Sequence, residues 1–183
     1  MSALGSKQGF YDPREIGALA ERIQSVVDVQ GPVHVDEAFR SVARCWGYAG
    51  LGSQIKLQLH QALGSIPLDD RPQLLGGKWL WPASMTPRTW RRFRVPGAEQ
   101  ATHRKAEHIP SEEIANAART ILERAIGWVE RVELAKETAQ LFWIRRLGRN
   151  VSACLDAGIE VLAEHCDVDG SRLRLKESAG ADV

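Results

Sequence analysis

The chain has 183 residues, of which 44% are hydrophobic and 26% are charged, the composition of an ordinary globular protein. Its formal net charge of +1 excludes a globally basic protein, and no apolar run reaches the length of a membrane-spanning helix. The charge is unevenly spread, since residues 1–82 have net charge 0, residues 83–108 have +4 and residues 109–183 have −3. A local basic patch is enough for contacts with phosphate groups, so nucleic acid stays open as a partner.

The cysteines and the two chain ends indicate the cellular compartment in which the protein is expected. Cys45, Cys154 and Cys166 lack the paired Cys and His spacing of a zinc site, so we expect free thiols and neither metal nor other cofactor. Residues 1–10 have no apolar signal-peptide core and are interpreted as a disordered lead-in, and residues 177–183 as a disordered tail. These features predict a cytoplasmic protein without membrane association.

The first two helices are predicted from apolar residues at helical spacing. The first begins at Pro13, a good first-turn residue, and ends before Gly31-Pro32. His34 then occupies the position of an N-cap, and the second helix runs from there to Trp46, which is expected to be a core residue.

A third helix and a hairpin complete this unit. The turn at residues 47–52 leads to a helix that Ser53 is expected to cap and Pro67 to end. Residues 74–81 contain a Gly-Gly pair between two apolar runs, which is typical of a β-hairpin. Three helices followed by a hairpin is the element order of a winged helix, so residues 11–82 are predicted to form one such domain.

The rest of the chain repeats this pattern. Residues 31–66 align with residues 127–162 at an offset of 96, and apolar positions coincide, as in the pairing of Trp46 with Phe142. Upstream of this segment the offset is 98, and downstream it is 93, so the length changes fall where loops are expected.

The second copy predicts helices from near Pro110 and a hairpin with an Asp-Gly turn at residues 166–175. We therefore predict a mainly α protein with small β wings, built from tandem winged-helix-like domains at residues 11–82 and 109–176. Residues 83–108, with proline breaks and no sustained period, are interpreted as a basic linker, part of which lies along one of the domains.

Candidate nucleic-acid contacts fall in three places. The start of the third helix enters a DNA groove in helix-turn-helix proteins, and arginine suits both phosphate and guanine edges. Linker arginines interleaved with Trp90 and Phe93 suit binding to a nucleic-acid backbone, with an aromatic ring stacked on a base. Arginines on the last strand of a winged helix suit contacts with phosphate or the minor groove. The candidates are Arg145, Arg146, Arg149 and Asn150 at the third helix, Arg172 and Arg174 in the wing, Arg88, Arg91, Arg92 and Arg94 in the linker, and Lys56 and Lys78 in the first domain. Ordinary solvated surface charge is the alternative interpretation of each group.

Four stretches of the sequence carry a family resemblance. They are GPVHVDEAFRSVARCWGYAGLGSQI, KWLWP, IPSEEIANAARTILERAIG and FWIRRLGRNV. The chain resembles, over roughly residues 11–175, the domain-of-unknown-function 3320 family (DUF3320), whose members lie near the C-terminus of large bacterial superfamily 1 helicases. The resemblance implies association with DNA-processing machinery and no known activity. The basic residues typical of the turn before the third helix are present at residues 144–151 but missing at residues 48–55.

Two functions remain open. The first is a non-catalytic nucleic-acid-binding accessory module that serves a helicase or nuclease system in DNA processing or defence, with weak and sequence-independent binding to DNA. The second is a protein-interaction module that grips a partner chain, as tandem winged helices do in chromosome-condensation accessory subunits. Trp128 and Trp143, which replace Pro32 and Gly47 of the first copy, are expected to be exposed and would suit a protein contact. No phosphate-loop, nucleophile-elbow or zinc-protease motif occurs, so we expect no enzyme activity.

Overall fold

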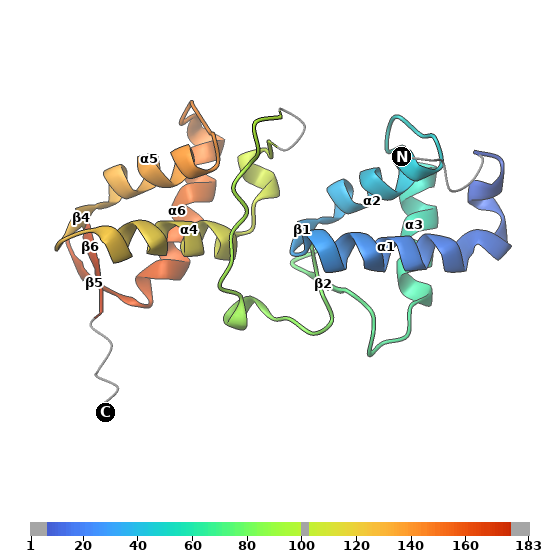
Figure 1. The fold of residues 1–183 in the computed structure, drawn as a ribbon, viewed down its shortest axis with the longest axis horizontal. Coiled ribbons are helices and arrows are strands. Elements are labelled where there is room, and N and C mark those ends of the chain that lie inside the picture. The colour runs from blue at the N-terminus through green and yellow to red at the C-terminus, as the bar shows by residue number, and fades with distance from the viewer. Residues whose placement is uncertain (1–6, 100–102, 177–183) are drawn as a thin grey trace. The chain divides into compact units, whose positions relative to one another are not determined.

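The computed structural model describes residues 7–99 and 103–176 and divides between Thr89 and Trp90 into two compact units. We call them the first and the second domain. Each is built from three α-helices and one small three-stranded antiparallel sheet (Figure 1). The predicted mainly α class with small β elements is confirmed.

The first domain has the helices and the hairpin expected from the sequence, and one further strand. Its elements are α1 (Ile16–Gln30), β1 (Val33–His34), α2 (Val35–Cys45), α3 (Ser53–Ser65), β2 (Gln73–Leu75) and β3 (Trp79–Trp81). The sheet order is β1-β3-β2, with Val33 paired to Leu80. Periodicity did not reveal β1, because a two-residue strand is too short to show alternation.

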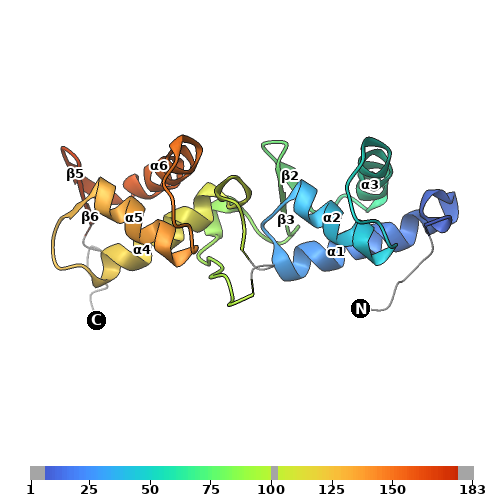
Figure 2. The ribbon, with the colours of Figure 1, turned by 90° about the horizontal axis from the view of Figure 1, so that it is seen from above.

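The second domain repeats the same order of elements. They are α4 (Ser111–Arg124), β4 (Val129–Glu130), α5 (Arg131–Leu141), α6 (Arg149–Ala163), β5 (Cys166–Asp169) and β6 (Arg172–Leu175). The sheet order is β4-β6-β5, and Val129 pairs with Leu173 as Val33 pairs with Leu80. In both domains the first two helices pack side by side, and the sheet lies at one end of them (Figure 2).

Local signals in the sequence explain most element boundaries. His34 caps α2 as predicted, since its Nδ1 accepts a hydrogen bond from the Asp36 N–H at 3.2 Å. Gly76 and Gly77 have φ angles of 57° and 67°, which allow the tight β2–β3 turn. At α3 the N-cap is Gly52 rather than Ser53, so the predicted cap is one residue too late and makes no side-chain bond.

The core of the first domain extends into the predicted lead-in. Phe10 is fully buried, and its ring meets the rings of Trp46 and Tyr48 edge-on. Its carbonyl accepts a hydrogen bond from the Gln58 amide at 3.2 Å. Residues 7–10 therefore belong to the first domain, because the core needs this aromatic ring. Residues 1–6 of the lead-in and the tail at 177–183 lie outside the described residues.

In the second domain, α4 and α6 approach each other closely at Gly158. A Cβ atom at this position would overlap Cγ2 of Ile114 on α4, so a side chain here would force the two helices or Ile114 to move. The corresponding residue of the first domain is Ala62, which is fully buried. The two cores thus share their plan but differ in how tightly the first and third helices pack.

Candidate nucleic-acid interface

The turn that leads from α5 to α6 ends the helix through a left-handed residue. The N–H of Trp143 donates to the Gln140 carbonyl, and the N–H of Ile144 donates to the Ala139 carbonyl, both at 2.9 Å. This pair of bonds is the Schellman pattern of helix ends. Trp143 itself has a φ of 57°, a conformation that costs a residue with a Cβ atom about 1–2 kcal/mol.

The first domain builds the same turn with a glycine. There the N–H of Gly47 donates to the Arg44 carbonyl at 3.0 Å, and the N–H of Tyr48 donates to the Ala43 carbonyl at 3.1 Å. Gly47 has a φ of 82°, which glycine adopts without that cost. Because a glycine suffices for the fold, folding alone does not account for the indole of Trp143, which is 43% exposed.

Four of the predicted contact residues lie together after this turn, and we call them the basic turn: Arg145, Arg146, Arg149 and Asn150. All four are exposed. Within residues 7–99 and 103–176, their side chains form no ion pair, hydrogen bond or ring contact. Arg149 and Asn150 open α6, whose N-cap is Gly148, and the unpaired N–H groups and dipole of this helix end add positive potential.

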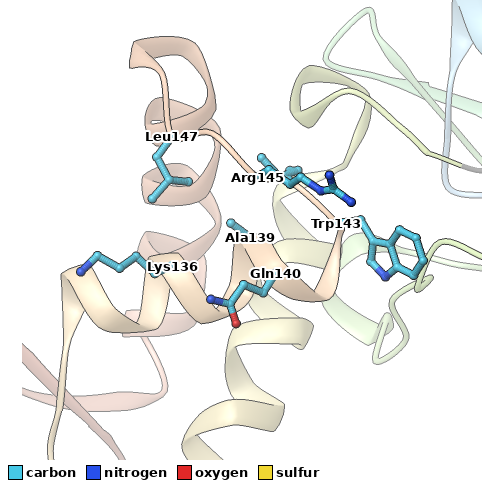
Figure 3. Close-up of a pocket in the computed structure, with 7 residues that line it drawn as sticks. Lys136, Ala139, Gln140, Trp143, Arg145 and Leu147 are labelled. Atoms are coloured by element: carbon cyan, nitrogen blue, oxygen red, sulfur yellow. The ribbon is translucent and has the colours of Figure 1, made fainter. Parts of the chain in front are cut away.

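A pocket of about 540 Å³ lies beside the basic turn (Figure 3). Its lining combines one face of α5 with the loop that leads to α6. The lining residues are Lys136, Ala139, Gln140, Trp143, Ile144, Arg145 and Leu147. The Trp143 indole projects from the end of α5, and the Arg145 side chain extends toward the same side. An exposed aromatic ring, an arginine and an amide are thus combined at one surface.

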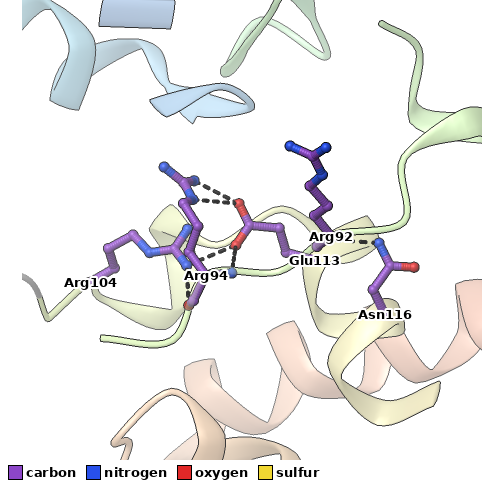
Figure 4. A network of polar contacts seen from close by, with 5 residues as sticks. All are labelled: Arg92, Arg94, Arg104, Glu113 and Asn116. Carbon is purple, nitrogen blue, oxygen red and sulfur yellow. Dashed lines mark hydrogen bonds and ion pairs between the residues drawn. The ribbon is translucent and has the colours of Figure 1, made fainter. Parts of the chain in front are cut away.

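The linker carries a buried ion-pair network that the sequence analysis missed. Glu113 of α4 is fully buried, and its carboxylate accepts from Arg94 Nη2 at 2.6 Å and from Arg104 Nη2 at 2.8 Å (Figure 4). Burial lowers the pKa of Arg94, although the charge of Glu113 opposes this shift. The missed signal was that Glu113 lies one turn before Ala117, on the apolar face of its helix.

Two further contacts attach the linker to the second domain. The Asn116 amide donates to the backbone carbonyls of Trp90 at 3.2 Å and of Arg92 at 3.1 Å. The ring of Phe93 packs edge-on against Phe142, and Trp90 is 9% exposed. The aromatic residues that were predicted to stack on nucleic acid therefore fill apolar space in the domain.

The linker arginines differ in what they contact. Arg94 is engaged by Glu113, so its charge is neutralised inside the protein. Arg91 donates through Nη1 to the Trp90 carbonyl at 2.9 Å. Arg88 and Arg92 are exposed, and the Arg92 side chain points away from Glu113 (Figure 4). The four linker arginines therefore do not form one exposed basic surface.

The predicted wing arginines are also engaged. Arg172 forms an ion pair with Asp169, and Arg174 pairs with Asp167 at 2.9 Å. Both guanidinium groups lie over the ring of Trp128, at 5.9 Å and 4.9 Å from its centroid. The β5–β6 hairpin and the basic turn lie at opposite ends of α5, a helix of 11 residues that is about 16 Å long. The structure therefore does not combine them into one site.

In the first domain, Lys56 and Lys78 differ in what their side chains contact. Lys56 Nζ pairs with Asp36 at 2.7 Å, whereas Lys78 is exposed at the β2–β3 turn. Burial alone would raise the pKa of Asp36, but the hydrogen bond and charge of Lys56, with smaller effects of His34 and Arg40, lower it. At the positions of Arg145 and Arg146, this domain has an alanine and a glycine.

The described residues show neither a metal site nor a membrane-spanning helix. In the described parts of the chain, no three His, Cys, Asp or Glu side chains gather as a metal site requires, and no helix is both long and apolar enough to cross a membrane. In the same residues Cys45, Cys154 and Cys166 form no disulfide, and burial raises the pKa of the Cys166 thiol.

Comparison with known proteins bears on the first domain. One family model, described as a protein of unknown function (DUF3320), matches residues 8–56, which include α1, β1, α2 and the start of α3. No curated protein and no solved structure matches the chain. The family match supports, over residues 8–56, the resemblance to the DUF3320 family found in the sequence.

Proposed function

We propose that this chain is a non-catalytic nucleic-acid-binding module that holds DNA through the basic turn of its second domain. In this proposal each domain is a winged helix. The order of the helices and strands, together with the sheet orders β1-β3-β2 and β4-β6-β5, supports this view. In such domains the third helix presents its N-terminal residues to DNA, and α6 begins with Arg149 and Asn150.

One observation carries the proposal. Arg145, Arg146 and Arg149 are exposed and engaged by no side chain of the described residues. By contrast, Lys56 and Arg94 are engaged by carboxylates. Unpaired guanidinium groups are free to bind phosphate, and their planar forks suit bidentate contacts.

Such an interface favours binding that is weak and independent of base sequence. Phosphate contacts supply affinity without reading the sequence, and the near-neutral net charge of the chain adds little attraction at long range. Asn150 is the one residue of the basic turn whose amide suits an adenine edge. The family resemblance suggests a helicase or nuclease as the larger partner.

The test is a salt titration of binding to a short blunt DNA duplex, followed by fluorescence anisotropy. The variant Arg145→Ala/Arg146→Ala/Arg149→Ala removes three phosphate contacts. The slope of log affinity against log salt should therefore fall by about 2.7. The free energy of unfolding should change by no more than about 0.5 kcal/mol, because substitutions of exposed residues have small effects on stability.

A matched control removes the same charge from the first domain. Arg44→Ala/Lys56→Ala/Lys78→Ala also lowers the net charge by three, but its residues lie outside the basic turn. It should leave most of the salt slope in place. If both triple variants lose the same slope, binding follows total charge and the assignment to the basic turn is wrong.

A protein-binding module is the second candidate, and exposed apolar residues favour it. Ile126 is fully exposed, Val132 is 62% exposed and Leu147 is 42% exposed, all in the second domain. Trp128 and Trp143 are exposed as predicted, at 38% and 43%. Absence of DNA binding by the unmodified protein at about 50 mM salt would favour this candidate, because phosphate contacts are strong at low salt.

A further inference from the structure

We propose that the ligand of the second domain is a DNA duplex with an unpaired extension, and that Trp143 stacks on the first unpaired base. The inference rests on the proposed function, and it names the kind of DNA that the same site takes. It is carried by the exposed indole, by its left-handed backbone and by the pocket beside it.

The backbone at Trp143 indicates that its side chain serves something other than folding. The residue holds a φ of 57°, where the equivalent Gly47 has 82°. Strained, non-glycine positions of this kind concentrate at functional sites. Trp143 is also 43% exposed, whereas its neighbour Phe142 is 2% exposed and fills the core.

A contact with the linker helps to orient the indole. The ring of His103 meets the Trp143 ring edge-on, with centroids 4.9 Å apart. An edge-on contact covers part of the indole and limits its rotation, but it leaves ring surface for a flat ligand. A partly fixed, exposed indole is a suitable stacking platform for a nucleobase, since every base has a π-face.

The pocket supplies the groups that a splayed nucleotide needs. Its volume of about 540 Å³ lies in the range that accommodates small ligands. The exposed Gln140 amide can donate to and accept from a base edge, and its side chain has no hydrogen-bond partner among the described residues. Lys136 pairs with Glu133 at 2.7 Å, so its charge is already engaged.

The charge around the pocket favours a nucleotide over an apolar peptide. Arg145 lines the pocket and Arg146 follows it, and neither has a carboxylate partner in the described chain. A ligand that joins a flat aromatic ring to a phosphate matches both features. An unpaired base beside a duplex has this chemistry, and the duplex itself would lie on the start of α6.

The test compares a blunt duplex with the same duplex carrying a short single-stranded tail. Trp143→Gly removes the indole and places a glycine where the backbone favours one, so this variant should fold at least as well as the unmodified protein. It should lose about 5- to 100-fold in affinity for the tailed duplex, with blunt-duplex affinity unchanged within about twofold. Trp143→Phe, which keeps an aromatic ring, should retain most of the preference for the tail.

The outcomes separate this inference from the proposed function. If the unmodified protein binds both DNAs equally and Trp143→Gly changes neither, the inference is wrong, while binding that still depends on the three arginines upholds the proposed function. If neither DNA binds, both fail. If Trp143→Gly weakens both DNAs alike, the indole contacts the duplex, and the inference is overturned.

Discussion

The two domains have the same order of helices and strands, the same sheet order and the same turn after the second helix, yet they differ in what that turn presents. The first domain has Ala49, Gly50 and Ser53 where the second has Arg145, Arg146 and Arg149. At the left-handed position, Gly47 corresponds to Trp143. The two turns can therefore differ in sequence while the fold stays the same, because exposed turn residues contribute little to the core that defines the fold.

A second difference lies where each first helix begins. Glu15 precedes α1 and is partly exposed, whereas the equivalent Glu113 lies inside α4 and is fully buried. Two linker arginines neutralise Glu113. The second domain thus depends on ion pairs with the linker, a segment outside its repeat unit.

The largest expected effect tests this dependence. Glu113→Gln leaves Arg94 and Arg104 without their carboxylate, which should destabilise the second domain by about 3 kcal/mol. The matched change Glu15→Gln should cost less than about 0.5 kcal/mol, because that side chain is partly exposed. Hydrogen exchange resolved by segment should show the loss of protection in α4 and not in α1. Equal losses in the two helices would mean that the network does not stabilise the second domain specifically.

An intermediate effect is expected when the basic turn is moved to the first domain. The starting protein is the variant Arg145→Ala/Arg146→Ala/Arg149→Ala. Adding Ala49→Arg/Gly50→Arg/Ser53→Arg to it should raise the slope of log affinity against log salt again by about 2.7. Gly50 accepts a side chain, since no atom lies within 4 Å of a Cβ built there. Fluorescence anisotropy on a blunt duplex measures the result. If the slope stays low, the backbone and neighbouring residues of the second domain contribute to DNA binding in addition to its arginines.

The smallest expected effect concerns pH. The pKa of Asp36 is lowered in the folded state, so ionised Asp36 stabilises the first domain at pH values above its unfolded pKa of about 3.9. This contribution is lost as the pH falls through the lowered value. Lys56→Gln should therefore cost at most about 1 kcal/mol at neutral pH, since the pair is partly solvated, and less at an acidic pH below the lowered pKa of Asp36.

Urea unfolding of both proteins at the two pH values measures this difference, with segment-resolved hydrogen exchange to assign it to the first domain. The second domain offers an internal control, because it has Val132 and Ser152 at the equivalent positions and no such pair. A cost for Lys56→Gln that is the same at both pH values would exclude the ion pair as its origin.

The elements of both domains were predictable because their signals are local. Apolar spacing identified the six α-helices of the described residues, and glycine turns identified both hairpins. The alignment of the chain with itself at an offset of 96 residues predicted that the second copy has the same elements as the first. The arginines of the basic turn could also be found, since they directly precede or begin a helix that the repeat had already located.

The contacts of the candidate residues were not predictable, because they join segments that are distant in the sequence. Glu113 and Arg94 are 19 residues apart, and only the fold brings the guanidinium to the carboxylate. The same holds for Phe10, which reaches Trp46 from a stretch that reads as polar and disordered.

The sequence by itself determined the two helical units, their hairpins and the presence of a basic segment, since propensity, periodicity and turn chemistry act over a few residues. Only the tertiary structure decided which cations are engaged and which are free. Arg94, Arg172 and Lys56 look like Arg145 in the sequence, but each has a carboxylate within reach in the folded chain. Charge availability depends on neighbours in space, and these are set by packing.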